Sequence, residues 1–180
     1  INKLDEKFDK NNIAIIGLGG TGSWVFQELI MNNVKNIKLI DCDVIEESNL
    51  QRQTIYQSDD IGKYKVDVLE NYAKSKNKNL NIAKSKSKIG NGYDCENELL
   101  GCDLIICTAD EPSATEISTI INTFCIKHKK TMVSTLGYTN AIINLPFTYL
   151  PNNLNSPCVK CHYNENNFFE NYDLINKGIG

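Results

Sequence analysis

The sequence holds 180 residues, 41% of them apolar, which is enough to bury the core of one α/β domain. The net charge of −3 is nearly balanced and the lysines are interleaved with acids and asparagines, so nucleic acid is not indicated as a partner. No apolar run reaches the roughly 18 residues that span a bilayer, and no charged-then-apolar leader begins the chain, so we expect a soluble, cytoplasmic protein without a membrane partner.

Strands and helices are predicted to alternate through most of the chain. Short apolar runs bounded by glycine or polar residues indicate buried strands, and longer stretches with apolar residues at helical spacing indicate helices. In chain order we expect a strand at 13–17, a helix at 21–33, a strand at 36–41, a helix at 63–76, strands at 80–86 and 102–109, a helix at 113–130 and a strand at 131–137. This order is typical of a Rossmann-like, doubly wound, mainly parallel α/β sheet with right-handed crossovers.

The alternation stops after residue 137. Two β-prone stretches follow in "YTNAIINLPFTYL", separated by Pro146. They predict antiparallel or edge strands toward the C-terminus of an otherwise parallel sheet.

A glycine-rich loop joins the first predicted strand to the first predicted helix. Gly17, Gly19 and Gly22 form GxGxxG in that context, where backbone amides and the positive end of the helix dipole can hold phosphate. Asp41 ends the second predicted strand 19 positions after Gly22, near the distance at which an acid hydrogen-bonds ribose hydroxyls. The pattern predicts a bound nucleotide, with a tight turn that has no ligand as the alternative. The motif alone favours NAD.

The connection from Cys42 to Gly62 is about 20 residues long, and connections of this length between a strand and a helix are usually functional. Arg52 within it is the only arginine of the sequence. A guanidinium can fork onto two terminal phosphate oxygens, whereas an ammonium acts as a point charge. The full set of polar residues suits a polyphosphate better than a dinucleotide: Asp43, Asn49, Arg52, Gln53, Lys63 and Lys65.

Asp110 ends the stretch "CTAD" at the carboxyl end of the fourth predicted strand, where open α/β sheets gather ligands. One carboxylate beside phosphates is the usual way in which proteins hold Mg²⁺, so Asp110 is a candidate magnesium ligand. Alternatively, Asp110 could cap the following helix. The polar residues of the long connection could likewise be turn-formers and surface lysines of a solvated segment: Asp43, Asn49, Gln53, Lys63 and Lys65.

In four stretches the sequence resembles, in order and spacing, the motifs of the ThiF/MoeB/HesA family, whose members adenylate carboxyl termini as ubiquitin-activating enzymes do. The stretches are "GLGGTGSW", "DCDVIEESNLQRQ", "IGKYK" and "CTAD". The resemblance runs from about Asn12 to Cys161, and its "SNLQRQ" element is highly specific. Within the family, "GYTNAIINLPFTYLPNNLNSPCVKC" looks most like the branch that modifies ribosomal peptides, including the microcin C-type peptide adenylyltransferase.

The resemblance implies an ATP-binding adenylation domain over residues 1–150. The implied nucleotide ligands are Gly17, Gly19, Gly20, Gly22, Asp41, Asp43, Asn49 and Gln53. The implied catalytic residues are Arg52 and Lys65 on the triphosphate and Asp110 on Mg²⁺.

The implied reaction is attack by a substrate carboxylate on the α-phosphorus of ATP, with release of pyrophosphate. The partner would be a small protein or peptide with a free C-terminus, such as a ubiquitin-like sulfur carrier or a ribosomal precursor peptide, and the enzyme would be a homodimer. Some members pass the acyl group to a cysteine, but "STLGYTNA" after the fifth predicted strand has none. Cys125 lies in mid-helix on a pattern that indicates burial, so no thioester step is expected within these residues.

The seven cysteines are odd in number and mostly scattered, which argues against a disulfide framework. Cys158 and Cys161 form one CxxC, which supplies two of the four ligands of a structural zinc. A second pair completes the zinc site in the resembled family, so residues 151–180 are interpreted as an extension carrying part of a truncated zinc knuckle. A redox pair or two incidental thiols are the alternatives. The chain begins at Ile1 and ends unevenly, which predicts a fragment of a longer protein.

The sequence therefore favours an ATP-dependent adenylyltransferase. The opposing hypothesis is a non-catalytic ThiF-like module that binds a peptide or scaffolds a modification complex. Retention of Arg52, Lys65 and Asp110 together favours activity, because a scaffold has no need of this charge set. An NAD-dependent dehydrogenase is the third alternative.

Overall fold

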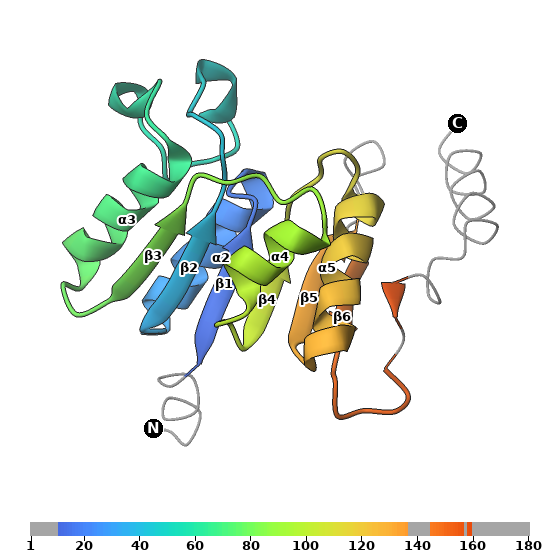
Figure 1. Ribbon diagram of the computed structural model, residues 1–180. Helices are drawn as coiled ribbons and strands as arrows, with labels where there is room; N and C mark the ends of the chain where they lie inside the picture. Colours follow the sequence, from blue (N-terminus) through green and yellow to red (C-terminus); the bar gives the residue numbers. More distant parts are fainter. Residues whose placement is uncertain (1–10, 137–144, 157, 160–180) are drawn as a thin grey trace.

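The computed structural model describes residues 11–136, 145–156, 158 and 159. Its described strands form a six-stranded sheet in the order β3-β2-β1-β4-β5-β6 (Figure 1). Neighbouring strands are parallel except β5 and β6, which are antiparallel. The predicted Rossmann-like α/β fold is thereby confirmed. The strands are β1 (Asn12–Ile16), β2 (Asn36–Ile40), β3 (Asn81–Ser85), β4 (Leu104–Cys107), β5 (Thr131–Leu136) and β6 (Leu145–Tyr149).

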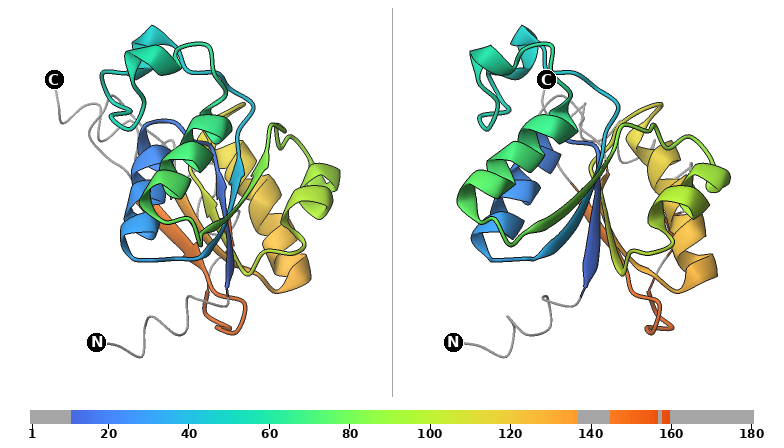
Figure 2. Two further views of the ribbon diagram at one scale, coloured as in Figure 1. Left: turned by 90° about the vertical axis from the view of Figure 1, so that its left-hand side faces the viewer. Right: turned by 60° about the vertical axis from the view of Figure 1, so that its left-hand side comes forward.

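Helices cover both faces of the sheet, as a doubly wound fold requires (Figure 2). Helices α2 (Gly20–Met31) and α3 (Lys65–Lys76) pack on one face, and α4 (Gly92–Leu99) and α5 (Ala114–His128) pack on the other. Alternate residues of β1 therefore enter two separate cores. Ile13 and Ile15 join the core on the side of α2 and α3, and Ala14 and Ile16 join the core on the side of α4 and α5. None of the described helices is both long and apolar enough to cross a membrane.

Pro146 lies inside β6, opposite Thr135 of β5, so it does not separate two strands as the sequence pattern predicted. A proline has no N–H to donate to a neighbouring strand, and β6 is the last strand in the described sheet, where such a residue is tolerated. The β-prone stretch before Pro146 falls at 137–144, outside the described residues.

The connection between β2 and α3, residues 41–64 and hereafter the crossover loop, has a defined fold, although most of its residues are exposed. It contains two short 3-10 turns, Glu47–Asn49 and Ser58–Asp60. Its base is closed by backbone hydrogen bonds from Ile45 N–H to the carbonyl oxygen of Lys63 (2.9 Å) and from Gly62 N–H to the carbonyl oxygen of Ile45 (2.8 Å). Figure 1 shows the loop projecting beyond the carboxyl edge of the sheet, where it can wall a site.

Candidate functional site

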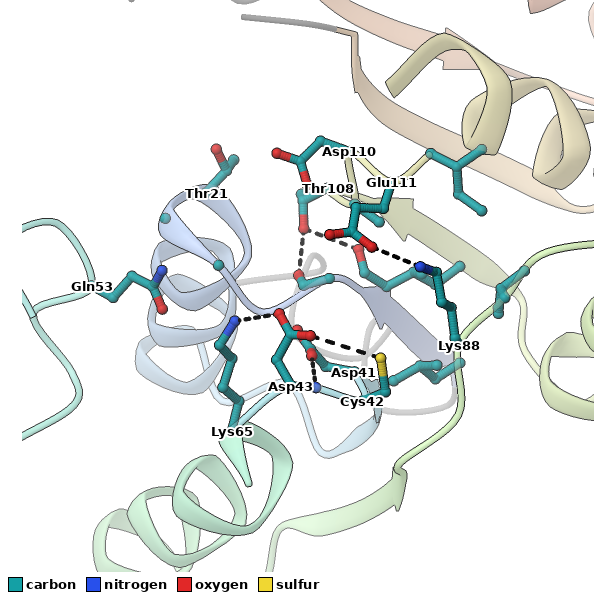
Figure 3. Close-up of a pocket in the computed structure, with 18 of the residues that line it drawn as sticks. Thr21, Asp41, Cys42, Asp43, Gln53, Lys65, Lys88, Thr108, Asp110 and Glu111 are labelled. Atoms are coloured by element: carbon teal, nitrogen blue, oxygen red, sulfur yellow. Dashed lines mark hydrogen bonds and ion pairs between the residues drawn. The ribbon is translucent and has the colours of Figure 1, made fainter. Parts of the chain in front are cut away.

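A cavity of about 670 Å³ opens where β1, β2 and β4 end, at the carboxyl edge of the sheet (Figure 3). Its volume falls within the range of small-molecule sites. The crossover loop and the first turns of α2 and α3 form one side, and the segments after β3 and β4 form the other. The cavity brings together these residues predicted from the sequence: Gly17, Gly19, Gly20, Asp41, Asp43, Asn49, Arg52, Gln53, Lys65 and Asp110.

Two of the four predicted loop glycines are required by packing within the chain. Gly17 has φ +84°, and a Cβ there would lie 2.6 Å from the backbone nitrogen of Ala109. A Cβ on Gly22, which does not line the cavity, would overlap the carbonyl oxygen of Gly17. A Cβ on Gly19 would lie 3.9 Å from Nε2 of Gln53, and a Cβ on Gly20 would lie 3.8 Å from Cδ of Arg52, which are ordinary contact distances. Gly17 and Gly22 therefore shape the loop, whereas Gly19 and Gly20 keep the cavity open beside it.

Asp41 connects the end of β2 to the glycine loop. Its Oδ2 accepts a hydrogen bond from the backbone N–H of Leu18 (2.6 Å), and its Oδ1 accepts one from the N–H of Asp43 (2.7 Å). Burial raises the pKa of Asp41, while these hydrogen bonds and the charge of Lys65 oppose that rise. Each carboxylate oxygen keeps a further acceptor direction. Asp41 as a ribose ligand stays a prediction, and the structure adds its role in fixing the loop.

Two residues that the sequence reasoning missed also hold the glycine loop. The buried Tyr56 hydroxyl, from the crossover loop, donates to the carbonyl oxygen of Leu18 (2.9 Å). Thr108 Oγ1, just after β4, donates to the carbonyl oxygen of Gly17 (2.6 Å). Burial, with a smaller effect from Asp41, raises the pKa of Tyr56, so the hydroxyl keeps its proton and remains a donor. The available signal was an aromatic residue within a polar segment, "RQTIYQ".

Lys65, at the first position of α3, is buried in the cavity wall and reaches toward the end of β2. Its Nζ lies 2.8 Å from Oδ2 of Asp43, and the two side chains are 6% and 60% exposed (Figure 3). The interpretation of Lys65 as a surface lysine is therefore wrong. Because an ammonium carries three donors, Lys65 can hold Asp43 and still donate into the cavity.

The remaining polar residues of the crossover loop differ in their placement. Arg52 is exposed; its Nη1 donates to the carbonyl oxygen of Ser48 (3.2 Å), and its Cδ lies 3.8 Å from the Cβ position of Gly20. Asn49 is buried, and its Oδ1 accepts from the N–H of Glu46 (3.2 Å), so it is a turn-former of the first 3-10 turn; it also lines the cavity, and its role as a nucleotide ligand stays a prediction. Lys63 pairs with Asp60 (2.9 Å) and does not line the cavity.

Asp110 and Glu111 line the cavity on the side of β4. The hypothesis that Asp110 caps the next helix is wrong, because the cap of α5 is Ser113, whose Oγ accepts from the N–H of Glu116 (3.1 Å). Glu111 Oε2 instead pairs with Nζ of Lys88 at 2.6 Å, a contact across the cavity from the segment after β3 (Figure 3). Asp110 thus faces the cavity and stays a predicted magnesium ligand.

One end of the cavity is apolar, which the polar motifs of the sequence did not predict. Four buried isoleucines from four different segments wall it: Ile16, Ile40, Ile89 and Ile117. Cys42 lies beside them, and burial together with Asp43 and Asp41 raises the pKa of its thiol, so it stays protonated. Such a surface suits the flat face of a base, whereas the glycine loop suits phosphate.

Cys125 and Cys158 do not line this cavity. Cys125 is buried in α5, and burial raises the pKa of its thiol to about 12, as expected for an inert structural residue. Cys158 is half-buried, and Cys161 lies outside the described residues. The zinc knuckle therefore stays a prediction.

The fold and the position of the cavity together place the chain in the Rossmann-like class of α/β proteins. Its glycine loop, the acid that ends the second strand and the strand order at the carboxyl edge all follow that pattern. The chain belongs to the ThiF family, whose model matches residues 2–177. The predicted resemblance to the ThiF/MoeB/HesA family is thereby confirmed.

Several known proteins are similar in sequence to this chain. The chain is 26% identical over 167 residues to the adenylyltransferase and sulfurtransferase UBA4 of Scheffersomyces stipitis, and the match covers 89% of this chain and 35% of that protein. It is 34% identical over 89 residues to the NEDD8-activating enzyme E1 catalytic subunit of Dictyostelium discoideum, covering 49% and 20%. The solved structure of E. coli MccB with ATP matches with a TM-score of 0.79 at 26% identity, covering 97% of this chain and 50% of that chain. The chain spans about a third of the length of its UBA4 relatives.

Proposed function

We propose that this chain is the nucleotide-binding part of an ATP-dependent adenylyltransferase, which activates the C-terminal carboxylate of a small protein or peptide and releases pyrophosphate. One observation carries the proposal: a single cavity combines the glycine loop with two cations and a carboxylate suited to a metal-bound triphosphate, namely Arg52, Lys65 and Asp110. Family membership and the similarity to a protein solved with ATP support this assignment over a dehydrogenase.

In this reaction a carboxylate oxygen of the substrate attacks the α-phosphorus of ATP. A new P–O bond forms while the bond from the α-phosphorus to the oxygen shared with the β-phosphate breaks, which leaves an acyl adenylate and pyrophosphate. The substrate supplies the nucleophile, so the protein acts by positioning and by stabilising charge. Lys65 and Arg52 would hold the triphosphate while negative charge moves onto the departing pyrophosphate.

Asp110 fits the requirements of a Mg²⁺ ligand at this site. Its carboxylate is exposed to the cavity on the side opposite the crossover loop, and no hydrogen bond or ion pair occupies it within the described part of the chain (Figure 3). Bound beside phosphates, Mg²⁺ takes one or two carboxylates, keeps several waters and neutralises phosphate charge.

The expected acyl substrate is argued by analogy with the similar proteins. Solved structures of E. coli MccB include one with MccA, and the UBA4 relatives are named adenylyltransferases and sulfurtransferases. We therefore expect a ubiquitin-like sulfur carrier or a ribosomal precursor peptide as the substrate of this chain. A homodimer and a structural zinc at Cys158 and Cys161 belong to the same proposal.

Exchange of labelled pyrophosphate into ATP, with Mg²⁺ and a set of peptides that differ in their last residue, tests the proposal. We expect exchange with free carboxyl termini and none with the same peptides amidated. Exchange that persists with amidated peptides would contradict carboxylate activation. ATP binding without any exchange would favour the non-catalytic module, and preferred binding of NAD would favour the dehydrogenase.

A further inference from the structure

The side-chain amide of Gln53 is enclosed in the cavity wall, yet its oxygen is not hydrogen-bonded. Gln53 is 1% exposed, and among the described residues Oε1 has no partner. The residue lines the cavity from the crossover loop, and its Nε2 lies 3.9 Å from the Cβ position of Gly19. Figure 3 shows the amide turned toward the start of α2. Because an enclosed acceptor without a donor is unfavourable, we expect its donor to come from a ligand.

The backbone around Gln53 fixes this placement. Its N–H donates to the carbonyl oxygen of Asn49 (3.0 Å), and its own carbonyl oxygen accepts from the N–H of Tyr56 (3.1 Å). Tyr56 is itself anchored to the glycine loop through its hydroxyl. The amide of Gln53 is therefore positioned by a turn that is bonded on both sides.

The chemistry of the expected ligands narrows the choice of donor. Phosphate and carboxylate oxygens are acceptors, so neither the triphosphate nor the attacking carboxylate satisfies Oε1. The donors of a nucleotide are its ribose hydroxyls and base amino groups, which are expected near Asp41 and the apolar end of the cavity. Figure 3 shows Gln53 on the opposite side of the cavity from Lys88, which lies beside that apolar end. A peptide substrate brings one further donor, because the N–H of its last peptide bond is separated from the attacking carboxylate only by the terminal Cα.

We propose that Gln53 is a positioning residue for the acyl substrate: its Oε1 accepts a hydrogen bond from the N–H of the C-terminal residue of the peptide. This assignment rests on the proposed function and adds a substrate class to it. Peptides whose last residue carries an N–H are substrates, and peptides that end in proline, which lacks this N–H, are poor ones.

Replacing the terminal N–H by an ester oxygen tests this contact at the level of one atom. Pyrophosphate exchange is measured for the peptide and its ester analogue, with the wild-type chain and with Gln53→Met, which keeps the length of the side chain and removes the amide. We expect kcat/KM for the peptide to fall about 10-fold on either change alone, and the second change to add little once the first is made. The KM for ATP should stay within about 2-fold, because this proposal replaces the nucleotide contact that the family resemblance implied for Gln53 by a contact with the peptide.

The unfolding temperature of Gln53→Met separates the proposed role from a purely structural one, because loss of a structural residue would lower this temperature. Loss of an amide that makes no hydrogen bond to any described residue should leave this temperature unchanged or raised. If the ester and Gln53→Met each lowered kcat/KM by the same factor whether or not the other change was present, the assignment to Gln53 would be overturned. A KM for ATP that rises as much as kcat/KM for the peptide falls would also overturn it. The wild-type chain by itself also tests the assignment. Equal exchange with the peptide, its ester and a proline-ended analogue would overturn the hydrogen bond proposed for Gln53. Absence of exchange with every peptide would instead overturn the proposed function itself, and this inference with it.

Discussion

Arg52 and Lys63 are exposed cations of the same crossover loop and form a matched pair for mutation. Arg52 lines the cavity beside Gly20, whereas Lys63 pairs with Asp60 and lies outside the cavity lining. We expect Arg52→Ala to lower the rate of pyrophosphate exchange on the order of 10² or more, as for other preorganised groups that stabilise transition-state charge. Arg52→Lys should recover only part of the rate, because it keeps the charge and loses the fork.

The control for Arg52 is Lys63→Ala, which removes an equal charge from the same segment. Its exchange rate should stay within about 2-fold of the wild-type rate, since an exposed ion pair contributes little. Equal losses in the two variants would show that the loop acts only through its net charge, and the role given to Arg52 would then be wrong.

Single residues were predictable where their type or spacing was unusual. Arg52 stood out among lysines, and Asp41 stood at a set distance from the glycine loop. Tyr56 and Thr108 were missed because they act through contacts with Leu18 and Gly17, which are 38 and 91 positions away in the chain. Tyr56 was conspicuous as an aromatic residue in a polar segment, but no local pattern marks its contact or that of Thr108, so both roles needed the fold.

The glycine loop, as an element, predicts a difference between two alanine substitutions. Gly22→Ala places a methyl group on the backbone oxygen of Gly17, which cannot move aside without shifting the loop, so we expect a loss of roughly 1–3 kcal/mol in the free energy of unfolding. Gly20→Ala has room and should unfold at a similar urea concentration to wild type. Its methyl group narrows the cavity instead, so the affinity for ATP should fall. A Gly20→Ala variant that unfolds as easily as Gly22→Ala would contradict this division of roles.

Helix α4 shows why one element escaped sequence-based prediction. Only Cys95 and Leu99 are buried along it, so the sequence has no apolar stripe that would predict a helix. Its start was nevertheless encoded, because Asn91 Oδ1 accepts from the N–H of Asp94 (3.1 Å) and Asp94 Oδ2 accepts in return from the N–H of Asn91 (3.1 Å). A capping box of this kind predicts a helix start even where periodicity does not.

Glu98 at the end of α4 joins that helix to the sheet and makes the fold sensitive to acid. Its carboxylate lies 2.7 Å from Nζ of Lys38 and accepts from the hydroxyls of Ser85 and Ser87, each at 2.8 Å. Burial alone would raise the pKa of Glu98, but these partners outweigh it and lower the pKa below the ordinary 4.5. The stabilisation is therefore present above pH 4.5 and is lost as the pH falls through the lowered value in the folded state.

Glu98→Gln should accordingly cost about 1 kcal/mol in the free energy of unfolding at pH 7 and progressively less in acid. Urea unfolding of the variant and the wild type at neutral and acidic pH measures that difference. The control is Glu28→Gln on the exposed part of α2, which should change stability little at either pH. A difference between Glu98→Gln and wild type that grows as the pH falls would have the wrong sign for this network.

For the molecule as a whole, the predicted nucleotide residues all lie between Gly17 and Asp110, in the part of the sheet built from β1 to β4. The chain spans about a third of the length of its UBA4 relatives, yet its own described segments line this cavity. Nucleotide binding should therefore be a property of these 180 residues, and the fold should be stabilised by the nucleotide it prefers.

Thermal unfolding with and without ligand measures that preference. A ligand at 100 times its Kd adds about 2.7 kcal/mol to the stability of the folded state, which corresponds to a rise of roughly 5–10 °C for a chain of this size. We expect such a rise with ATP and Mg²⁺ and a much smaller one with NAD, because Arg52 and Lys65 supply the charge that a triphosphate needs. Lys65→Met should abolish most of the rise, and Asp110→Asn should remove the part that depends on Mg²⁺. If NAD raised the unfolding temperature as much as ATP, the cavity would not be selective for a triphosphate and adenylation would lose its physical basis.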